Sequence, residues 1–593
     1  MYNSYGMEVT FQHLATSRFT NRGKSCLTFY GRTATGESVA VHVYDIKPYG
    51  YVQADMQWWN YNKPYIMEYL KWIILLDRMD SAEKWGFTGN VREMSLGETG
   101  WLKKAAETAI LAEGVSGYNI RNVHESEPDH FIKITAENSN ILRSIIKCIK
   151  APDKAKNIVL EARKKLRKIK PNRPKRHKDE RYDDWMARVR DIDFEFKMPD
   201  MPGDPQWDKK DVMETHLSED LIWMVDNKIP SCGWITASGS LSEAPRTTCT
   251  LDIDITSSSS HWLREEKNPP QPMAPFRILS YDIEAQPHVI PGKSETEFPE
   301  PDKDPILCIG VGVFNMVDLK IQQYCFMWEP EGEPCKEYPA LKPEEQTDDY
   351  YAEKTIVKSF KNEYDMLLAF NNFVQIEIDP DIITGYNILN FDNVYTIQRA
   401  QHLWEKMGPD PSIDKAWRWG RSEKRMCTLK KKYTWTAQRG GKTTWECRIE
   451  GREFMDLYTI IMTDHKLRSY KMDEVAKEFL GTQKIHIDYD DIPIMQQTAE
   501  GRIRLGAYCA KDAWIPCQLT IKMSKAINAI LMSQVAGVSL DTILNRGQQI
   551  RTLSLMLKKV KERAEKGQHR WFIPDEDEPP NTGSFEGAVV ITP

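Results

Sequence analysis

Three apolar, strand-like runs follow one another in the middle of the chain, and they constrain the fold more than any other feature. They are Phe276–Glu284, Pro305–Phe314 and Ile321–Met327. Further on, the pattern predicts a helix over 354–373, a buried strand over 381–384 and a helix over 391–405. Consecutive strands followed by strand–helix alternation are typical of a mixed sheet with helices on both faces. The predicted fold class for this region is therefore α/β.

The first 275 residues predict a β-rich α+β region instead. Strand patterns cover 26–30, 38–44 and 130–135, and helical spacing covers 65–76 and 139–149. The Pro-rich stretch Lys267–Pro275 is typical of a stiff linker. We therefore expect a domain boundary there, immediately before the α/β region.

Composition narrows the class of protein. The chain has 593 residues, of which 41% are hydrophobic, and no apolar run approaches the roughly 20 residues of a membrane span. Its eleven cysteines form no Cys-x-x-Cys pair, which argues against a zinc ribbon or a disulfide scaffold. The first residues lack the pattern of a secretory signal. A reducing compartment is the simpler interpretation, so we expect the nucleus or the cytoplasm.

Charge is distributed unevenly along the chain. The net charge is −6, but residues 164–178 are strongly basic and residues 342–351 are acidic. A nucleic acid partner would therefore be held by local basic surfaces and by metal ions rather than by a uniformly basic protein. The basic run is either a localisation signal or DNA-backbone patch, or, more often for such runs, a solvated linker.

Two carboxylates stand at the end of the first central strand. In Asp282-Ile-Glu284 the acidic side chains are two residues apart, so on a strand they point to the same side. Hard divalent cations prefer oxygen ligands of this kind. Alone, such a pair is usually a solvated strand edge.

Two later stretches offer further carboxylates. Tyr508 and Asp512 are four residues apart in a helical stretch and therefore share one helix face. Asp392 follows a turn-forming segment and falls in the first turn of the predicted helix, where the helix dipole favours an anion. Each pattern is weak evidence alone. Tyr-x-x-x-Asp normally lies on an exposed helix surface, and Tyr-Asn-x-x-x-Phe-Asp can be a capped helix start. Together the four carboxylates are the ingredients of two-metal phosphodiester hydrolysis.

The ordered set resembles the three exonuclease motifs of family B DNA polymerases, of the DEDD class with a tyrosine in the third motif. Asp282 and Glu284 match the first motif. The second is matched by Tyr386, Asn387, Phe391 and Asp392, and the third by Tyr508 and Asp512. The resemblance implies a ribonuclease H-like 3′–5′ exonuclease domain that uses two Mg²⁺ or Mn²⁺ ions. It assigns the metals to Asp282, Glu284, Asp392 and Asp512 and places Tyr508 beside the attacking water.

Other segments resemble eukaryotic delta-type replicative polymerases and their large-virus relatives. Examples are Leu279–Glu284, Asp379–Asn387, Leu467–Lys471 and Asn545–Gln549. The resemblance implies an N-terminal domain over 1–150 with an atypical insertion at about 52–115, and a basic linker or insertion over 151–205. It further implies the rest of the N-terminal domain over 206–275, the exonuclease domain over 276–524 and a helical connection with the start of a palm over 525–593. A viral member of the family would act in its host cell.

The family's palm motifs do not occur in this sequence. Asp488-Tyr-Asp-Asp491 is only a superficial echo of one of them, because it precedes the third exonuclease motif. Residues 584–593 resemble the segment just before the first palm motif. We therefore expect DNA degradation but no polymerisation from this chain alone. Palm, fingers and thumb would come from a second chain or a C-terminal portion, which leaves a fragment and a split polymerase both open.

A hairpin is predicted around Gly440-Gly441, between the second and third motifs. In the family a hairpin at this place helps to separate the primer end from the template. Trp435 and Trp445 would then either stack on bases or form a cross-strand pair with each other. With Tyr386, Asn387 and Phe391 they are the candidate DNA-binding residues.

The leading hypothesis is the proofreading part of a replicative DNA polymerase, which acts on the single-stranded or frayed 3′ end of a primer. A second hypothesis is a non-catalytic scaffold that binds DNA or polymerase subunits. The presence of all four carboxylates and Tyr508 argues against that loss of catalysis. A third is a self-sufficient repair exonuclease, which the family-like segment at 584–593 makes less favoured.

Overall fold

The computed structural model describes residues 7–84, 110–120, 127–151, 157, 160, 210–255, 262–289, 296–329, 354–408, 414–423, 425–436, 440–484 and 487–575. The chain divides into two compact units. One draws on Met1–Arg18, Leu27–Val43 and Asn227–Leu555, and the other on Phe19–Cys26, Tyr44–Asp226 and Met556–Pro593. The charged runs 164–178 and 342–351 and the segment 584–593 lie outside the described residues, and the five predicted domain ranges stay predictions.

The central sheet of the first unit contains six described strands. Their order is β16 (Ile356–Phe360), β15 (Gln322–Trp328), β14 (Ile306–Asn315), β11 (Arg277–Ala285), β17 (Ile382–Gly385) and β20 (Glu453–Asp456). β11 lies in the middle, antiparallel to β14 and parallel to β17. The three consecutive strands and the mixed α/β sheet expected from the sequence are confirmed.

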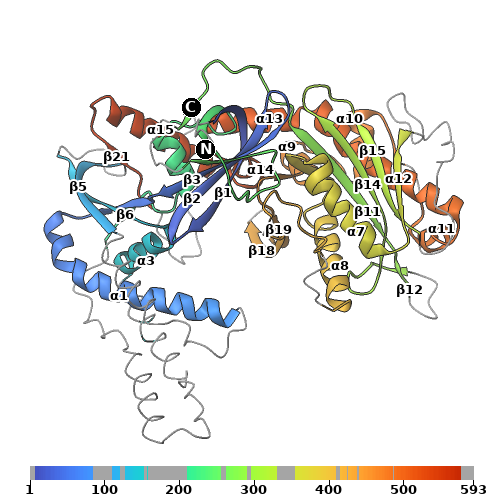
Figure 1. The fold of residues 1–593 in the computed structure, drawn as a ribbon, viewed down its shortest axis with the longest axis horizontal. Coiled ribbons are helices and arrows are strands. Elements are labelled where there is room, and N and C mark those ends of the chain that lie inside the picture. The colour runs from blue at the N-terminus through green and yellow to red at the C-terminus, as the bar shows by residue number, and fades with distance from the viewer. Residues whose placement is uncertain are drawn as a thin grey trace, which may run out of the picture. The chain divides into compact units, whose positions relative to one another are not determined.

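Helices cover the two faces of this sheet (Figure 1). Alternate residues of β11 point to opposite faces, as on any strand. Leu279, Tyr281 and Ile283 share a core with α7 (Glu363–Asn372) and α8 (Asp392–Lys406). Ile278 shares another core with α12 (Ala499–Lys522). Asp282 and Glu284 have the same parity as Ile278, so the strand directs them towards α12.

The predicted helix over 354–373 is wrong in its first half. Residues Ile356–Phe360 form β16, which pairs in parallel with β15. The helix begins only at Glu363, after Asn362, whose side chain accepts a hydrogen bond from the Tyr364 backbone N–H at 2.8 Å. The β-branched Ile356 and Val357 suit an edge strand, and the cap at Asn362 sets where the helix begins.

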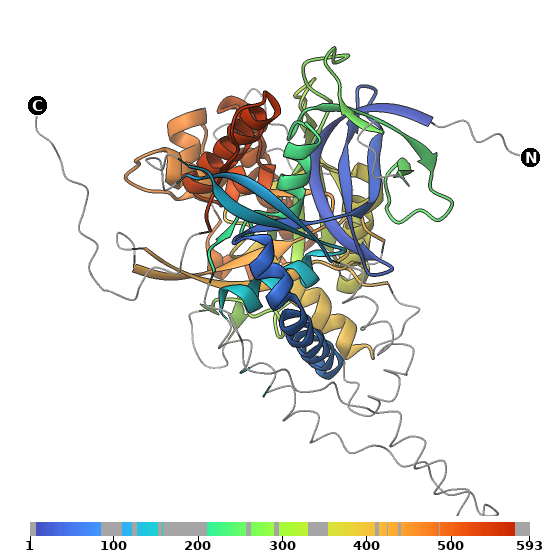
Figure 2. The same cartoon turned by 90° about the vertical axis from the view of Figure 1, so that its left-hand side faces the viewer.

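A second sheet of the first unit combines strands from distant parts of the sequence (Figure 2). The order is β1 (Met7–Asn21), β2 (Lys24–Thr33), β3 (Ser38–Ile46), β9 (Leu251–Ile255), β8 (Trp234–Leu241) and β10 (Leu263–Glu265), and β1 also pairs with β8. Both predicted early strands therefore form, and the β-rich character of the N-terminal region is confirmed.

The second unit is built on the order β21 (Trp571–Phe572), β5 (Ile110–Asn119), β6 (Asp129–Ala136), β4 (Tyr49–Gln53) and β7 (Val212–Met213). Helix α3 (Ser139–Lys150) buries Ile145 and Ile149, and α1 (Met56–Lys84) buries Trp59 and Ile66 in the same core. The amphipathic pattern at 139–149 and the helical spacing at 65–76 thus correspond to helices. Among the described residues, no helix is long and apolar enough to span a membrane.

The hairpin between the second and third motifs consists of β18 (Thr428–Thr436) and β19 (Gly440–Arg448). The two glycines do not form its turn: Gly440 and Gly441 already pair with Thr436 and Trp435. The alternative of a Trp435–Trp445 cross-strand pair is wrong, because Trp445 lies opposite Lys431. The Lys431 ammonium lies 4.9 Å from the centre of the Trp445 ring.

Candidate active site

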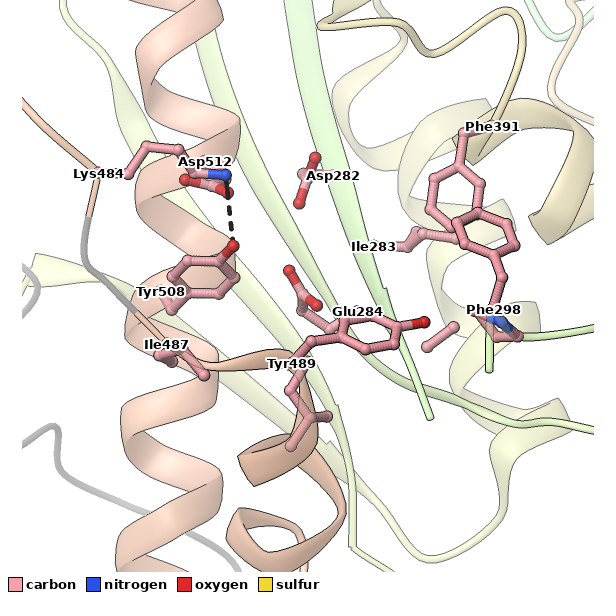
Figure 3. A pocket seen from close by; sticks show the side chains of 13 residues that line it. Asp282, Ile283, Glu284, Phe298, Phe391, Lys484, Ile487, Tyr489, Tyr508 and Asp512 are labelled. Atoms are coloured by element: carbon pink, nitrogen blue, oxygen red, sulfur yellow. Dashed lines mark hydrogen bonds and ion pairs between the residues drawn. The ribbon is translucent and has the colours of Figure 1, made fainter. Parts of the chain in front are cut away.

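A pocket of about 240 Å³ opens where β11 passes α12, and it contains carboxylates from both elements (Figure 3). Asp282 and Glu284 project from the strand, and Tyr508 and Asp512 from the helix. The remaining lining residues are Ile283, Ala285, Phe298, Pro299, Phe391, Lys484, Ile487, Tyr489 and Ile492. The two residues spaced two apart on the strand and the two spaced four apart on the helix therefore all face this pocket.

Asp392 reaches the same neighbourhood from the opposite helix layer. It is the first residue of α8 and is buried, and its carboxylate accepts a hydrogen bond from the Ile283 backbone N–H at 3.1 Å. This contact fixes Asp392 against the residue between Asp282 and Glu284. All four candidate carboxylates therefore converge on one end of β11, although Asp392 does not line the pocket itself.

The turn that delivers Asp392 is held by Asp456, at the end of β20. The Asp456 carboxylate accepts backbone hydrogen bonds from Asn387 at 2.8 Å, from Leu389 at 3.4 Å and from Tyr458 at 3.0 Å. Asn387 itself has a positive φ of 65°. Sequence reasoning did not identify Asp456, because it contributes through a fold contact rather than through a local motif.

Lys484 is a further site residue that sequence reasoning missed. Its ammonium forms an ion pair with Asp512 and donates a hydrogen bond to the Tyr508 hydroxyl at 3.3 Å (Figure 3). It stands 24 residues before Tyr508 and belongs to no helical or strand pattern with it. Only the fold brings this cation to the carboxylates.

Burial and mutual repulsion disfavour the ionised form of these carboxyls. Burial, then the charges of Asp392 and Asp512, raise the pKa of Asp282 well above its usual range. Burial and Asp512 raise the pKa of Glu284 to about 8. Burial raises the pKa of Asp392 to about 7, against the Ile283 hydrogen bond. Carboxyl groups at close range cannot all ionise without compensating cations.

The donor set suits divalent cations. Ligand atoms of Asp282, Glu284 and Cys509 lie within 4.8 Å of one another. One Asp512 oxygen is buried without a hydrogen-bond partner among the described residues. A buried unpartnered oxygen beside other carboxylates is costly unless a cation occupies the space. The acidic cluster therefore fits a group of hard metal ions held mainly by oxygen.

The candidate DNA-binding residues lie at different places. Phe391 lines the pocket, where its ring contacts that of Phe298 at 5.3 Å. The Tyr386 hydroxyl donates to the Tyr470 carbonyl at 2.5 Å, and the Asn387 side chain accepts from Asn390 at 3.0 Å. Trp445 lies on the hairpin, and the Trp435 side chain is outside the described residues. Of the candidates whose side chains are described, Tyr386, Asn387 and Trp445 do not line the pocket.

Comparison with known proteins identifies this domain. Residues 211–475 match the family model described as DNA polymerase family B, exonuclease domain. The chain over most of its length also has the fold of the family B DNA polymerase from the hyperthermophilic archaeon Pyrobaculum calidifontis. The TM-score is 0.55 at 17% identity, and the match covers 98% of this chain and 53% of that one. Residues 211–475 therefore match the exonuclease domain of DNA polymerase family B, and the chain shares the fold of that archaeal polymerase.

Within that family the chain is similar to the DNA polymerase delta catalytic subunits of eukaryotes. It is 32% identical to that of Dictyostelium discoideum over 66% of this chain, and 34% identical to that of Oryza sativa subsp. japonica over 64%. The subunit of Drosophila melanogaster matches 95% of this chain at 26% identity. The chain spans about a third to two fifths of these relatives, at 32%, 31% and 43% of their lengths.

Proposed function

We propose that this chain removes nucleotides from the 3′ end of DNA by metal-dependent hydrolysis, as the proofreading part of a replicative DNA polymerase. The observation that carries the proposal is the convergence of Asp282, Glu284, Asp392 and Asp512 at one end of β11. The first three of these lie within residues 211–475, which match the family B exonuclease model. We propose single-stranded or frayed primer ends as the substrate, because a pocket of about 240 Å³ is too small to admit a duplex.

The proposed cofactors are two Mg²⁺ or Mn²⁺ ions. Asp282, Glu284, Asp392 and Asp512 would hold them, and the ions would supply charge neutralisation at the phosphate and lower the pKa of a bound water. The protein's own contribution is positional. β11, α12 and the start of α8 fix the carboxylates, and the Tyr508 hydroxyl would orient the attacking water.

Lys484 has a second proposed role. Its ammonium forms an ion pair with Asp512. Within the same reach it can contact a phosphate oxygen, where a fixed cation stabilises the charge that develops on the reacting group. We further propose that palm, fingers and thumb act with this chain, as a second chain or a further portion of the polymerase. A nuclear site of action would follow from that role.

The test uses single-stranded DNA labelled at its 3′ end, with Mg²⁺ and purified chain. Release of labelled nucleoside monophosphate is expected from the wild type. With the Asp282→Ala/Glu284→Ala variant this release should fall to background. The matched control is Asp365→Ala/Glu405→Ala, which removes two exposed carboxylates of α7 and α8 and should leave the rate unchanged. Equal rates for the wild type and the Asp282→Ala/Glu284→Ala variant would overturn the proposal. Binding of DNA without turnover would favour the scaffold instead.

A further inference from the structure

Cys509 lies between the two halves of the carboxylate cluster without lining the pocket. It follows Tyr508 directly and precedes Asp512 by less than one helical turn. Its thiol donates to the Asp282 backbone carbonyl at 3.3 Å and accepts from the Gly310 backbone N–H at 3.0 Å. The side chain is fully buried. One sulfur atom thus connects α12 to both β11 and β14.

The strand register places the Cys509 contacts beside the carboxylates of the pocket. Asp282 and Gly310 are direct partners in the β11–β14 ladder. A Cβ atom at Gly310 would stand 2.2 Å from the Cys509 carbonyl oxygen, so only glycine allows the helix backbone to approach this closely. The helix rests on the strand at the point from which Asp282 projects.

The same arrangement occurs a second time, farther along α12. Ser280 pairs with Gly312 in the same ladder, and a Cβ atom at Gly312 would stand 2.8 Å from the Cys517 sulfur. Cys517 is also fully buried. The two cysteines are eight residues apart and share a helix face, but only Cys509 lies beside the carboxylates.

We propose that Cys509 is a positioning residue for the metal site. It fixes where Tyr508 and Asp512 lie along the sheet relative to Asp282 and Glu284. This inference rests on the proposed metal-binding role of the four carboxylates. The hydrogen bonds of the Cys509 sulfur to the backbone of β11 and β14 hold α12 in one register on the sheet, so that the carboxylates of the two elements face the same space. Groups that orient metal ligands typically change metal affinity by about 10- to 100-fold when they are removed.

The experiment measures Mn²⁺ binding by electron paramagnetic resonance on the full chain, with metal-free thermal unfolding as the second readout. Cys509→Val replaces the thiol by a slightly larger apolar side chain and removes its hydrogen bonds, Cys509→Ala removes them with a smaller side chain, and Cys509→Ser can remake them. The matched control is Cys517→Val. We expect Cys509→Val and Cys509→Ala to raise the Kd for Mn²⁺ about tenfold or more, Cys509→Ser to recover most of that loss, and Cys517→Val to bind Mn²⁺ like the wild type.

A wild-type Kd in Cys509→Val overturns the proposal, as does an equal weakening by Cys517→Val, which would indicate a general effect on folding. Mn²⁺ binding that is absent from the wild type, or that survives in Asp282→Ala/Glu284→Ala, overturns both this proposal and the metal site. Wild-type protein that binds Mn²⁺ but degrades no DNA would overturn the proposed function and leave the positioning role in place.

Discussion

At the scale of single residues, the site is a set of acidic groups held close together before any metal arrives. The folded-state pKa values of Glu284 and Asp392, about 8 and about 7, lie above the ordinary carboxyl values of 4.5 and 3.8. Between those limits the folded protein binds more protons than the unfolded chain. Burying these groups is therefore least costly at low pH.

One prediction follows for the pH dependence of stability. With EDTA present, the contribution of this site to the Tm should fall as the pH rises from about 5 to 8. Addition of Mg²⁺ should raise the Tm more at pH 8 than at pH 6. Thermal melts of the wild type and of Asp282→Asn/Glu284→Gln, which cannot ionise at these two positions, measure the difference. A variant that tracks the wild type at every pH would contradict the prediction.

Tyr508 gives a second prediction at this scale. Tyr508→Phe keeps the ring and removes the hydroxyl that we expect to orient the attacking water. A hydrogen bond to a charged group contributes about 1.5–3 kcal/mol, which corresponds to roughly a 10- to 150-fold loss in rate. Single-turnover degradation of single-stranded DNA would measure it. Tyr324→Phe, at a partly buried tyrosine of β15, is the control. A loss of rate in Tyr324→Phe larger than that in Tyr508→Phe would contradict the assigned role.

At the scale of elements, the position of Asp392 depends on the turn that precedes α8. The Asp456 carboxylate accepts three backbone hydrogen bonds, two of them from that turn. Removing a buried acceptor costs about 1–3 kcal/mol for each group left without a partner.

Asp456→Ala should therefore destabilise the protein by a few kcal/mol and lower the exonuclease rate, because the turn can no longer hold Asp392. Asp456→Asn retains one oxygen and should keep the two shorter hydrogen bonds. Its losses of stability and of exonuclease rate should therefore be smaller. Urea unfolding and single-turnover rates measure the two effects. An Asp456→Ala variant with a normal rate would show that the turn does not depend on this carboxylate.

Local patterns predicted those elements whose character is set by neighbouring residues. The apolar run before Asp282 became β11, and the period of Ile141, Leu142, Ile145 and Ile149 became the buried face of α3. Residues 356–360 were mistaken for helix because their pairing with β15 is a tertiary contact that the local pattern does not contain. Lys484 and Asp456 were missed for the same reason, since each acts on residues far away in the sequence.

At the scale of the whole molecule, a buried ionic network joins β2 of the N-terminal region to the central sheet. Arg32, Arg421 and Arg452 surround Asp379 and Asp381 at the start of β17. Burial would raise the pKa of Asp379, but Arg421 and Arg452 outweigh it and hold that pKa below its usual range. The Asp379 carboxylate therefore remains charged in the interior.

Arg32→Ala should destabilise the first unit by about 3 kcal/mol, the lower end of the cost of breaking a buried pair. Arg421 and Arg452 remain in place and limit the loss. Arg264→Ala is the matched control, because its partner Glu8 is exposed, and a surface pair of this kind contributes about 0–1 kcal/mol. Urea midpoints compare the two. Similar shifts for both variants would contradict the role of the network.

Arg32 donates from its Nε to Asp381 at 2.7 Å, across 349 positions of sequence. A genetic crossover anywhere between these two codons takes the guanidinium from one parent and its acceptor from the other. Hybrids between relatives would then keep this bond only where both parents encode the same pair. The N-terminal strands and the central sheet are therefore expected to be inherited together when relatives recombine.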